Sequence, residues 1–169
     1  MSQPQLMLGG VPIVLHAGAP VLSDDPIGAE HLHRMSDGAG IKATLWERAA
    51  GSISAQGWMP PGLGALDYSQ PLEFRSTQVD NMISADLVFT LPSTPRPDQA
   101  PWAFALVGDE WLPAACSTVD GEVTVTAVTG ASLYQVAWMP VYSVFASRPA
   151  RGYDSGAGAH SWSMAWEEA

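Results

Sequence analysis

The sequence predicts an all-β fold, a single-domain β-sandwich or barrel with long loops rich in proline and glycine. Sixteen glycines and fourteen prolines are spread over 169 residues, which leaves little room for long helices. Apolar and polar residues alternate in several short segments, as they do in half-buried strands. Turn signals such as Asp120-Gly121 separate these segments, and many short strands at this spacing are typical of sandwiches and barrels.

The N-terminal half is predicted to begin with a hairpin at Gly9-Gly10, with Pro12 restricting its second strand to an edge or a bulge. Residues 17–40 are rich in Gly, Pro and Asp and are expected to form a long loop with at most a short helical turn. A strand pair is then expected around Gly51. The predicted strands of this half are 6–8, 11–16, 41–48, 52–56 and 68–77.

The C-terminal half shows the clearer strand patterns. Trp162, Met164 and Trp166 share one face of a last strand, and Asp120-Gly121 is the strongest hairpin signal in the chain. A break or bulge is expected at Pro140. The predicted strands of this half are 85–91, 102–107, 111–118, 122–128, 133–145 and 160–166.

One β domain is expected over residues 1–169, with extended loops near 17–40, 57–64, 92–101 and 149–159. The second loop is apolar, so its tip needs either a partner or a core of its own. The third carries four prolines and should be extended and stiff, and the glycine-rich fourth should be mobile. The candidate subunit-interface residues in the second and third loops are Trp58, Met59, Pro60, Pro61, Leu63, Pro95 and Pro97.

The charge balance argues against tight nucleic-acid binding. Seven Lys plus Arg stand against seventeen Asp plus Glu, a formal charge of −10, and Lys42 is the single lysine. No basic signal region is visible before Arg34, so the chain is expected to be made and kept in the cytoplasm. The uncharged run 123–147 is long enough to span a bilayer, but its turn residues and alternating polar side chains indicate strands instead.

The sequence predicts no catalytic, metal or cofactor site. Cys116 lies in an apolar context with no nucleophile motif and is interpreted as a structural residue. His31 and His33 have ligand-like spacing, but no third ligand can be assigned, and a solvated pair is the preferred interpretation. The neighbouring acids Asp24-Asp25, Asp109-Glu110 and Glu167-Glu168 would point to opposite faces of a strand, so they are interpreted as turn and terminus residues. We therefore expect no enzymatic activity.

The seven tryptophans are interpreted mainly as core or subunit-interface residues. Trp58 is the best candidate for an exposed platform, because its loop is expected at the surface.

The chain resembles the small tail proteins of long-tailed bacteriophages in its acidic, lysine-poor, all-β character. The resemblance also rests on the extended linker Pro92-Ser93-Thr94-Pro95-Arg96-Pro97 and on the hairpin Val119-Asp120-Gly121-Glu122-Val123. Those families, the tail-tube, distal-tail and minor tail proteins, are sandwiches or barrels that form rings through loops and hairpins. The resemblance implies a virion structural protein that forms homo-oligomers, contacts other tail proteins and lets DNA pass through the assembly without binding it tightly. The alternative is a carbohydrate- or receptor-binding β-sandwich that uses Trp58 with His31 and His33.

Overall fold

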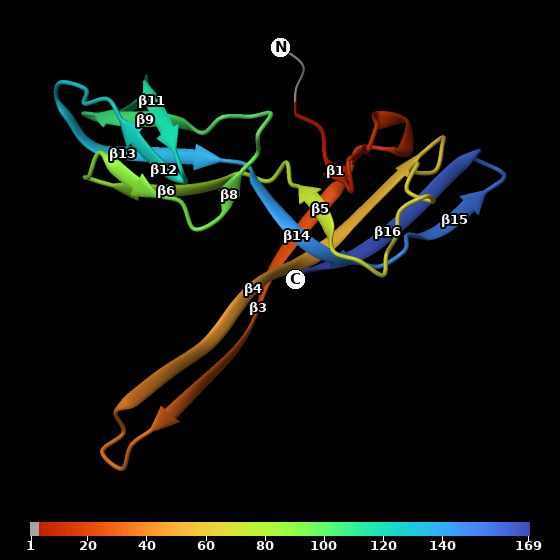
Figure 1. Ribbon diagram of the computed structural model, residues 1–169, viewed down its shortest axis with the longest axis horizontal. Coiled ribbons are helices and arrows are strands. Elements are labelled where there is room, and N and C mark those ends of the chain that lie inside the picture. Colours follow the sequence, from red (N-terminus) through yellow and green to blue (C-terminus); the bar gives the residue numbers. More distant parts are fainter. Residues whose placement is uncertain (1–3) are drawn as a thin grey trace. The chain divides into compact units, whose positions relative to one another are not determined.

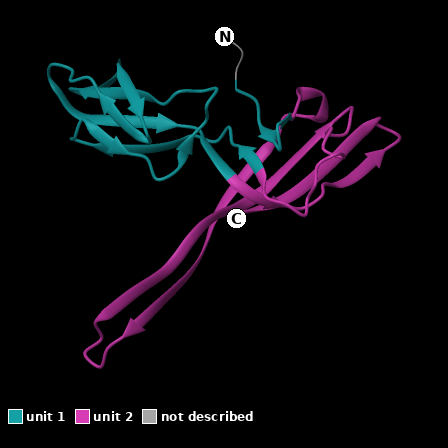
Figure 2. Cartoon of the chain, in the orientation of Figure 1, with its two compact units in different colours: residues 1–12, 73–142 teal, residues 13–72, 143–169 magenta. Residues whose placement is uncertain are grey.

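The computed structural model describes residues 4–169, and the all-β prediction is confirmed (Figure 1). Within these residues the regular elements are β-strands and one turn of 3-10 helix, η1 (Leu15–Ala17). Contacts divide the chain into two compact units (Figure 2): unit 1 contains residues 1–12 and 73–142, and unit 2 contains residues 13–72 and 143–169. The expectation of one domain over the whole chain stays a prediction.

Unit 1 contains a small β-sandwich. One sheet has the order β10-β9-β13-β6 and the other β11-β12-β7. Buried side chains from both sheets, among them Ala105, Val123 and Val136, form one core cluster, so the sheets pack face to face. These strands are β6 (Asp80–Ser84), β7 (Val88–Thr90), β9 (Trp102–Val107), β10 (Glu110–Ala114), β11 (Cys116–Val119), β12 (Glu122–Val125) and β13 (Ala131–Trp138).

Short strands complete unit 1. β1 pairs with both β2 and β5, and β8 pairs with the first residues of β14. Their bounds are β1 (Met7–Leu8), β2 (Val11–Pro12), β5 (Leu72–Arg75), β8 (Thr94–Pro95) and β14 (Pro140–Ala146).

Unit 2 is built around one antiparallel sheet. β16 (Ala159–Glu168) pairs along its length with β4 (Gly40–Gly57), which in turn pairs with the edge strand β3 (Val21–Arg34). The other side of β16 pairs first with β15 (Ala150–Asp154) and then with the end of β14. Trp162, Met164 and Trp166 on β16 are all buried, which confirms the alternation predicted for this strand.

Both predicted two-residue hairpins are present. Gly9 and Gly10 have φ values of 56° and 80° between β1 and β2, and Asp120 and Gly121 have 49° and 80° between β11 and β12. Positive φ at both central positions matches the right-handed twist of the flanking strands, and glycine adopts it without steric cost. The turn chemistry therefore located these hairpins correctly.

The loop predicted over residues 17–40 is wrong, because most of it is strand β3. Pro26 is tolerated because β3 is an edge strand. Gly28 passes so close to β4 that a Cβ there would lie 2.7 Å from the Trp46 carbonyl oxygen. The proline and the glycine that suggested a loop thus fit an edge strand and a close approach of two backbones.

The strand pair predicted around Gly51 is also wrong, because β4 runs through this residue without a turn. A Cβ at Gly51 would lie 1.9 Å from the Ser23 carbonyl oxygen of β3, so the glycine serves strand packing rather than chain reversal.

Two further boundaries differ from the prediction. Residues 150–154 of the expected 149–159 loop form β15, and the expected strand 111–118 is interrupted at Ala115 into β10 and β11, which belong to different sheets. The expected break near Pro140 is present, because β13 ends at Trp138 and β14 begins at Pro140.

Candidate functional site

The candidate functional site is a two-stranded β-hairpin that extends beyond the sheet of unit 2. β16 accompanies β4 only from Ala50 to Gly57, whereas β3 and β4 continue to pair as far as Arg34 and Gly40. We call residues 27–48 the arm; Figure 1 shows this ribbon of β3 and β4 leading away from the other strands of its unit. The eight strand residues from Ile27 to Arg34 correspond to a reach of about 25 Å.

Large apolar side chains on the arm are exposed to solvent. Leu45 is 78% exposed and Leu32 57% exposed, and three further apolar residues are half exposed or more. An isolated two-stranded ribbon is only marginally stable in water, and exposed apolar groups of this size usually mark an interaction site. The full set is Leu32, Met35, Ile41, Leu45 and Trp46.

The arm has no net formal charge, whereas the rest of the chain is strongly acidic. It carries three of the seven basic residues and three acidic ones, so the whole formal charge of −10 lies outside it. Lys42 forms an exposed ion pair with Glu30, and the hydrogen bond to that carboxylate raises the pKa of Lys42. A neutral, apolar arm can approach an acidic copy of the same chain without net repulsion.

The arm tip is closed by local hydrogen bonds. The Ala39 amide donates to Asp37 Oδ1 at 2.9 Å, and Arg34 Nη1 donates to the Gly38 carbonyl oxygen at 3.1 Å. Gly38 has a φ of 87°, which favours glycine. The sequence contains this turn signal, but the turn was not predicted because residues 17–40 were interpreted as one long loop.

The predicted interface residues of the 57–64 loop divide between exposed and buried positions. Trp58 is 63% exposed with its ring centroid 5.0 Å from that of His16, and Met59 is 47% exposed. Pro60 is exposed and Pro61 half-buried. Leu63 is 1% exposed, so this side chain packs within the chain and is not free for a subunit contact. The loop thus has both a core residue of its own and an exposed apolar tip.

The 92–101 segment is anchored on unit 1. Trp138 Nε1 donates to Ser93 Oγ at 2.9 Å, and the buried Arg96 guanidinium donates to the carbonyl oxygens of Ser76 at 3.0 Å and Gln5 at 2.8 Å. Pro95 is half-buried in β8, and Pro97 is exposed. Of the proposed contacts in this segment, Pro97 is therefore the more accessible.

The other candidates for chemistry are not brought together into a site. His31 and His33 lie near each other on the arm, with ring centroids 5.9 Å apart, and no group of three or more His, Cys, Asp or Glu in residues 4–169 is placed to hold a metal ion. The Cys116 thiol donates to the Pro101 carbonyl oxygen at 3.5 Å, and burial raises its pKa. In the described part of the chain, no helix is long and apolar enough to cross a membrane.

The platform suggested by Trp58 with His31 and His33 is not assembled in one chain. His31 pairs with Ala43, and Trp58 follows the last residue of β4, so roughly 45 Å of extended strand separates them. The exposed Trp58 ring instead lies beside His16.

The fold and the site define this chain as an all-β protein with an exposed, electrically neutral hairpin arm. In comparisons with known proteins, no family model, no curated protein and no solved structure matches it.

Trp58→Ala should weaken self-association by about 2 kcal/mol or more while leaving the thermal midpoint nearly unchanged. The reason is that Trp58 is largely exposed, so its truncation removes little buried surface within the chain. Native mass spectrometry over a concentration series, together with thermal melts, measures both quantities. Lower thermal stability with an unaltered oligomer would assign Trp58 to the fold instead.

Proposed function

We propose that this chain is a structural component of the tail or tail tip of a long-tailed bacteriophage, and that it works as a homo-oligomeric ring. The observation that carries the proposal is the arm, which exposes five large apolar side chains on a ribbon that pairs with no third strand among the described residues. Ordering such a ribbon costs conformational entropy, and burial against a neighbouring subunit offsets that cost.

The charge distribution supports the same proposal. The acidity lies outside the arm, so subunits can meet through neutral surface while the remaining surface stays acidic. An acidic lining suits a channel through which DNA slides, because like charges disfavour contact with phosphates. The proposed partners are other copies of the chain and neighbouring tail proteins, and the proposed location is the virion.

Negative-stain imaging of purified protein tests the proposal. We expect closed rings of uniform size, formed alone or on a neighbouring tail protein. A wild-type protein that remains monomeric at the highest attainable concentration and stays outside assembled particles would contradict the structural role.

A second candidate function, recognition of a carbohydrate or receptor, is favoured by the exposed Trp58 ring. An aromatic ring held at the surface by a neighbouring side chain offers a face for stacking. A saturable quench of tryptophan fluorescence by a glycan, absent in Trp58→Phe, would support this function. Unchanged emission across a glycan panel would remove its support.

A further inference from the structure

Two arginines of unit 2, Arg148 and Arg151, border the same depression and form no ion pair within the described residues. Lys42, Arg75 and Arg96 form ion pairs there, whereas the four other basic residues, Arg34, Arg48, Arg148 and Arg151, form none within 4 Å. Both side chains are exposed, and Arg148 lies over the Tyr68 ring, 5.5 Å from its centroid. The chain has a net charge of −10, so two neighbouring guanidinium groups without an ion-pair partner in the described residues form a local patch of positive charge.

The two arginines border one surface. Together they line a small depression of about 30 Å³ against the 57–64 loop, with Pro61, Leu63 and Gly64. We call this depression with its two guanidinium groups the arginine surface. Its apolar wall and paired cations suit a ligand that combines carboxylates with an apolar group.

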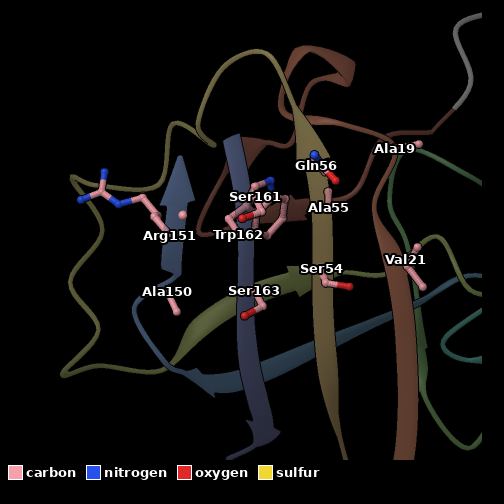
Figure 3. A pocket seen from close by; sticks show the side chains of 11 residues that line it. Ala19, Val21, Ser54, Ala55, Gln56, Ala150, Arg151, Ser161, Trp162 and Ser163 are labelled. Carbon is pink, nitrogen blue, oxygen red and sulfur yellow. The ribbon is translucent and has the colours of Figure 1, made fainter. Parts of the chain in front are cut away.

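The arginine surface continues onto a broad face of the sheet. Arg151 also borders a shallow trough of about 530 Å³ over β3, β4, β15 and β16, shown in Figure 3, and Arg148 borders a second trough of about 430 Å³. The two troughs share Ala150 and Ser163. Small, uncharged residues form most of the surroundings, so a protein segment can approach the backbone closely there.

The chain itself contains a segment with the complementary chemistry. Two adjacent acids, the turn residue Asp109 and the first β10 residue Glu110, lie where β9 connects to β10. Trp111 and Leu112 follow them and are 38% and 37% exposed. We call residues 108–112 the β9–β10 tip. Neither acid forms an ion pair in the described residues. Carboxylates pair with guanidinium groups in bidentate geometry, and an aromatic ring stacks on the guanidinium plane.

We propose that the arginine surface of one copy binds the β9–β10 tip of a second copy. This inference rests on the proposed function, since it requires self-assembly. The contact joins two different patches, so it is heterologous, and repetition of one such contact closes a ring when the rotation between copies permits. The second acidic turn, Asp120-Gly121-Glu122, is the competing occupant, but glycine separates its acids and no aromatic residue adjoins them.

Two charge-reversed proteins test the contact. One carries Asp109→Arg and Glu110→Arg, and the other carries Arg148→Glu and Arg151→Glu. Each protein alone opposes like charges at every copy of the contact, so we expect association at least about tenfold weaker than in the wild type. Mixed in equal amounts, the two proteins restore opposite charges at every contact of an alternating ring.

Native mass spectrometry with one protein isotopically labelled reads out the result, and circular dichroism checks that both variants fold. The expected result is association at least about tenfold weaker in each variant alone and alternating hetero-oligomers in the mixture. The matched control carries Asp120→Arg and Glu122→Arg and should assemble as the wild type does. If this control loses assembly while the β9–β10 variant assembles normally, the contact belongs to the Asp120-Gly121-Glu122 turn instead.

The outcomes separate this inference from the proposed function. If the wild type assembles and either charge-reversed variant assembles equally well, the inference is wrong and the proposed ring stands. If both variants lose assembly and the mixture fails to recover it, the inference is also wrong. If neither the wild type nor the mixture assembles, either alone or on a neighbouring tail protein, the homo-oligomeric role fails together with the inference.

Discussion

Removing the arm should abolish self-assembly while leaving the rest of the protein folded. The variant replaces residues 28–47 by Asn-Gly, so that Ile27 and Arg48, which pair in the native ribbon, flank a two-residue turn. We expect association to weaken by at least about a hundredfold, because several exposed apolar anchors are lost together. The thermal midpoint should move by no more than about 3 °C, since within residues 4–169 the arm pairs with no third strand.

Analytical ultracentrifugation and thermal melts measure the two quantities for the arm variant. A matched control keeps the length of the arm but replaces Leu32, Ile41 and Leu45 by Thr, which preserves strand propensity and removes apolar surface. The same loss of assembly in this control would locate the effect in the apolar side chains. Normal rings without the arm would contradict its role as the principal contact.

Arg96→Met should lower the free energy of unfolding by about 3 kcal/mol, because it leaves buried hydrogen-bond acceptors without a donor. Arg96 is 2% exposed and donates to the carbonyl oxygens of Ser76 and Gln5 and, through Nε and Nη2, to the Asp98 carboxylate at 2.9 and 2.8 Å. Methionine fills similar space but donates nothing. Urea unfolding of the two proteins at neutral pH measures the difference.

Arg48 is exposed and donates a hydrogen bond to the neighbouring Glu47 carbonyl oxygen, so Arg48→Met is the control for a change of charge alone. Its unfolding midpoint should match the wild type. If Arg96→Met does not fold, Arg96→Lys, which keeps the charge but loses the planar fork, should show an intermediate loss. A wild-type midpoint in Arg96→Met would show that the network does not stabilise the segment.

The same network predicts how stability depends on pH. The hydrogen bond from Arg96 lowers the pKa of Asp98, so its carboxylate contributes stability above the ordinary carboxyl range and loses it as the pH falls through the lowered value. The contribution is modest, because the Asp98 side chain is 39% exposed. Unfolding curves of wild type and Asp98→Asn should differ at neutral pH and converge in acid; a difference that persists in acid would contradict this assignment.

The sequence by itself determined the strand class, the two tight hairpins and the buried face of β16. These features depend on local chemistry: glycine at positive φ in the turns, and strict alternation where one strand face is buried. The exposed tip of the 57–64 loop was also predictable, because Trp58 and Met59 stand among prolines that prevent a regular strand.

Only the tertiary structure revealed the arm, because both of its faces are exposed and it lacks the alternation that burial imposes on a strand. Gly28 and Gly51 look like turn residues in the sequence, yet each permits a backbone approach that is set by a partner strand. Long-range packing likewise decided which arginines are buried. Arg96 is hydrogen-bonded to carbonyl oxygens that are distant in sequence, whereas Arg148 and Arg151 border a surface depression. Local sequence encodes turns and alternation, whereas the pairing of distant charges and backbones depends on which strands the fold makes neighbours.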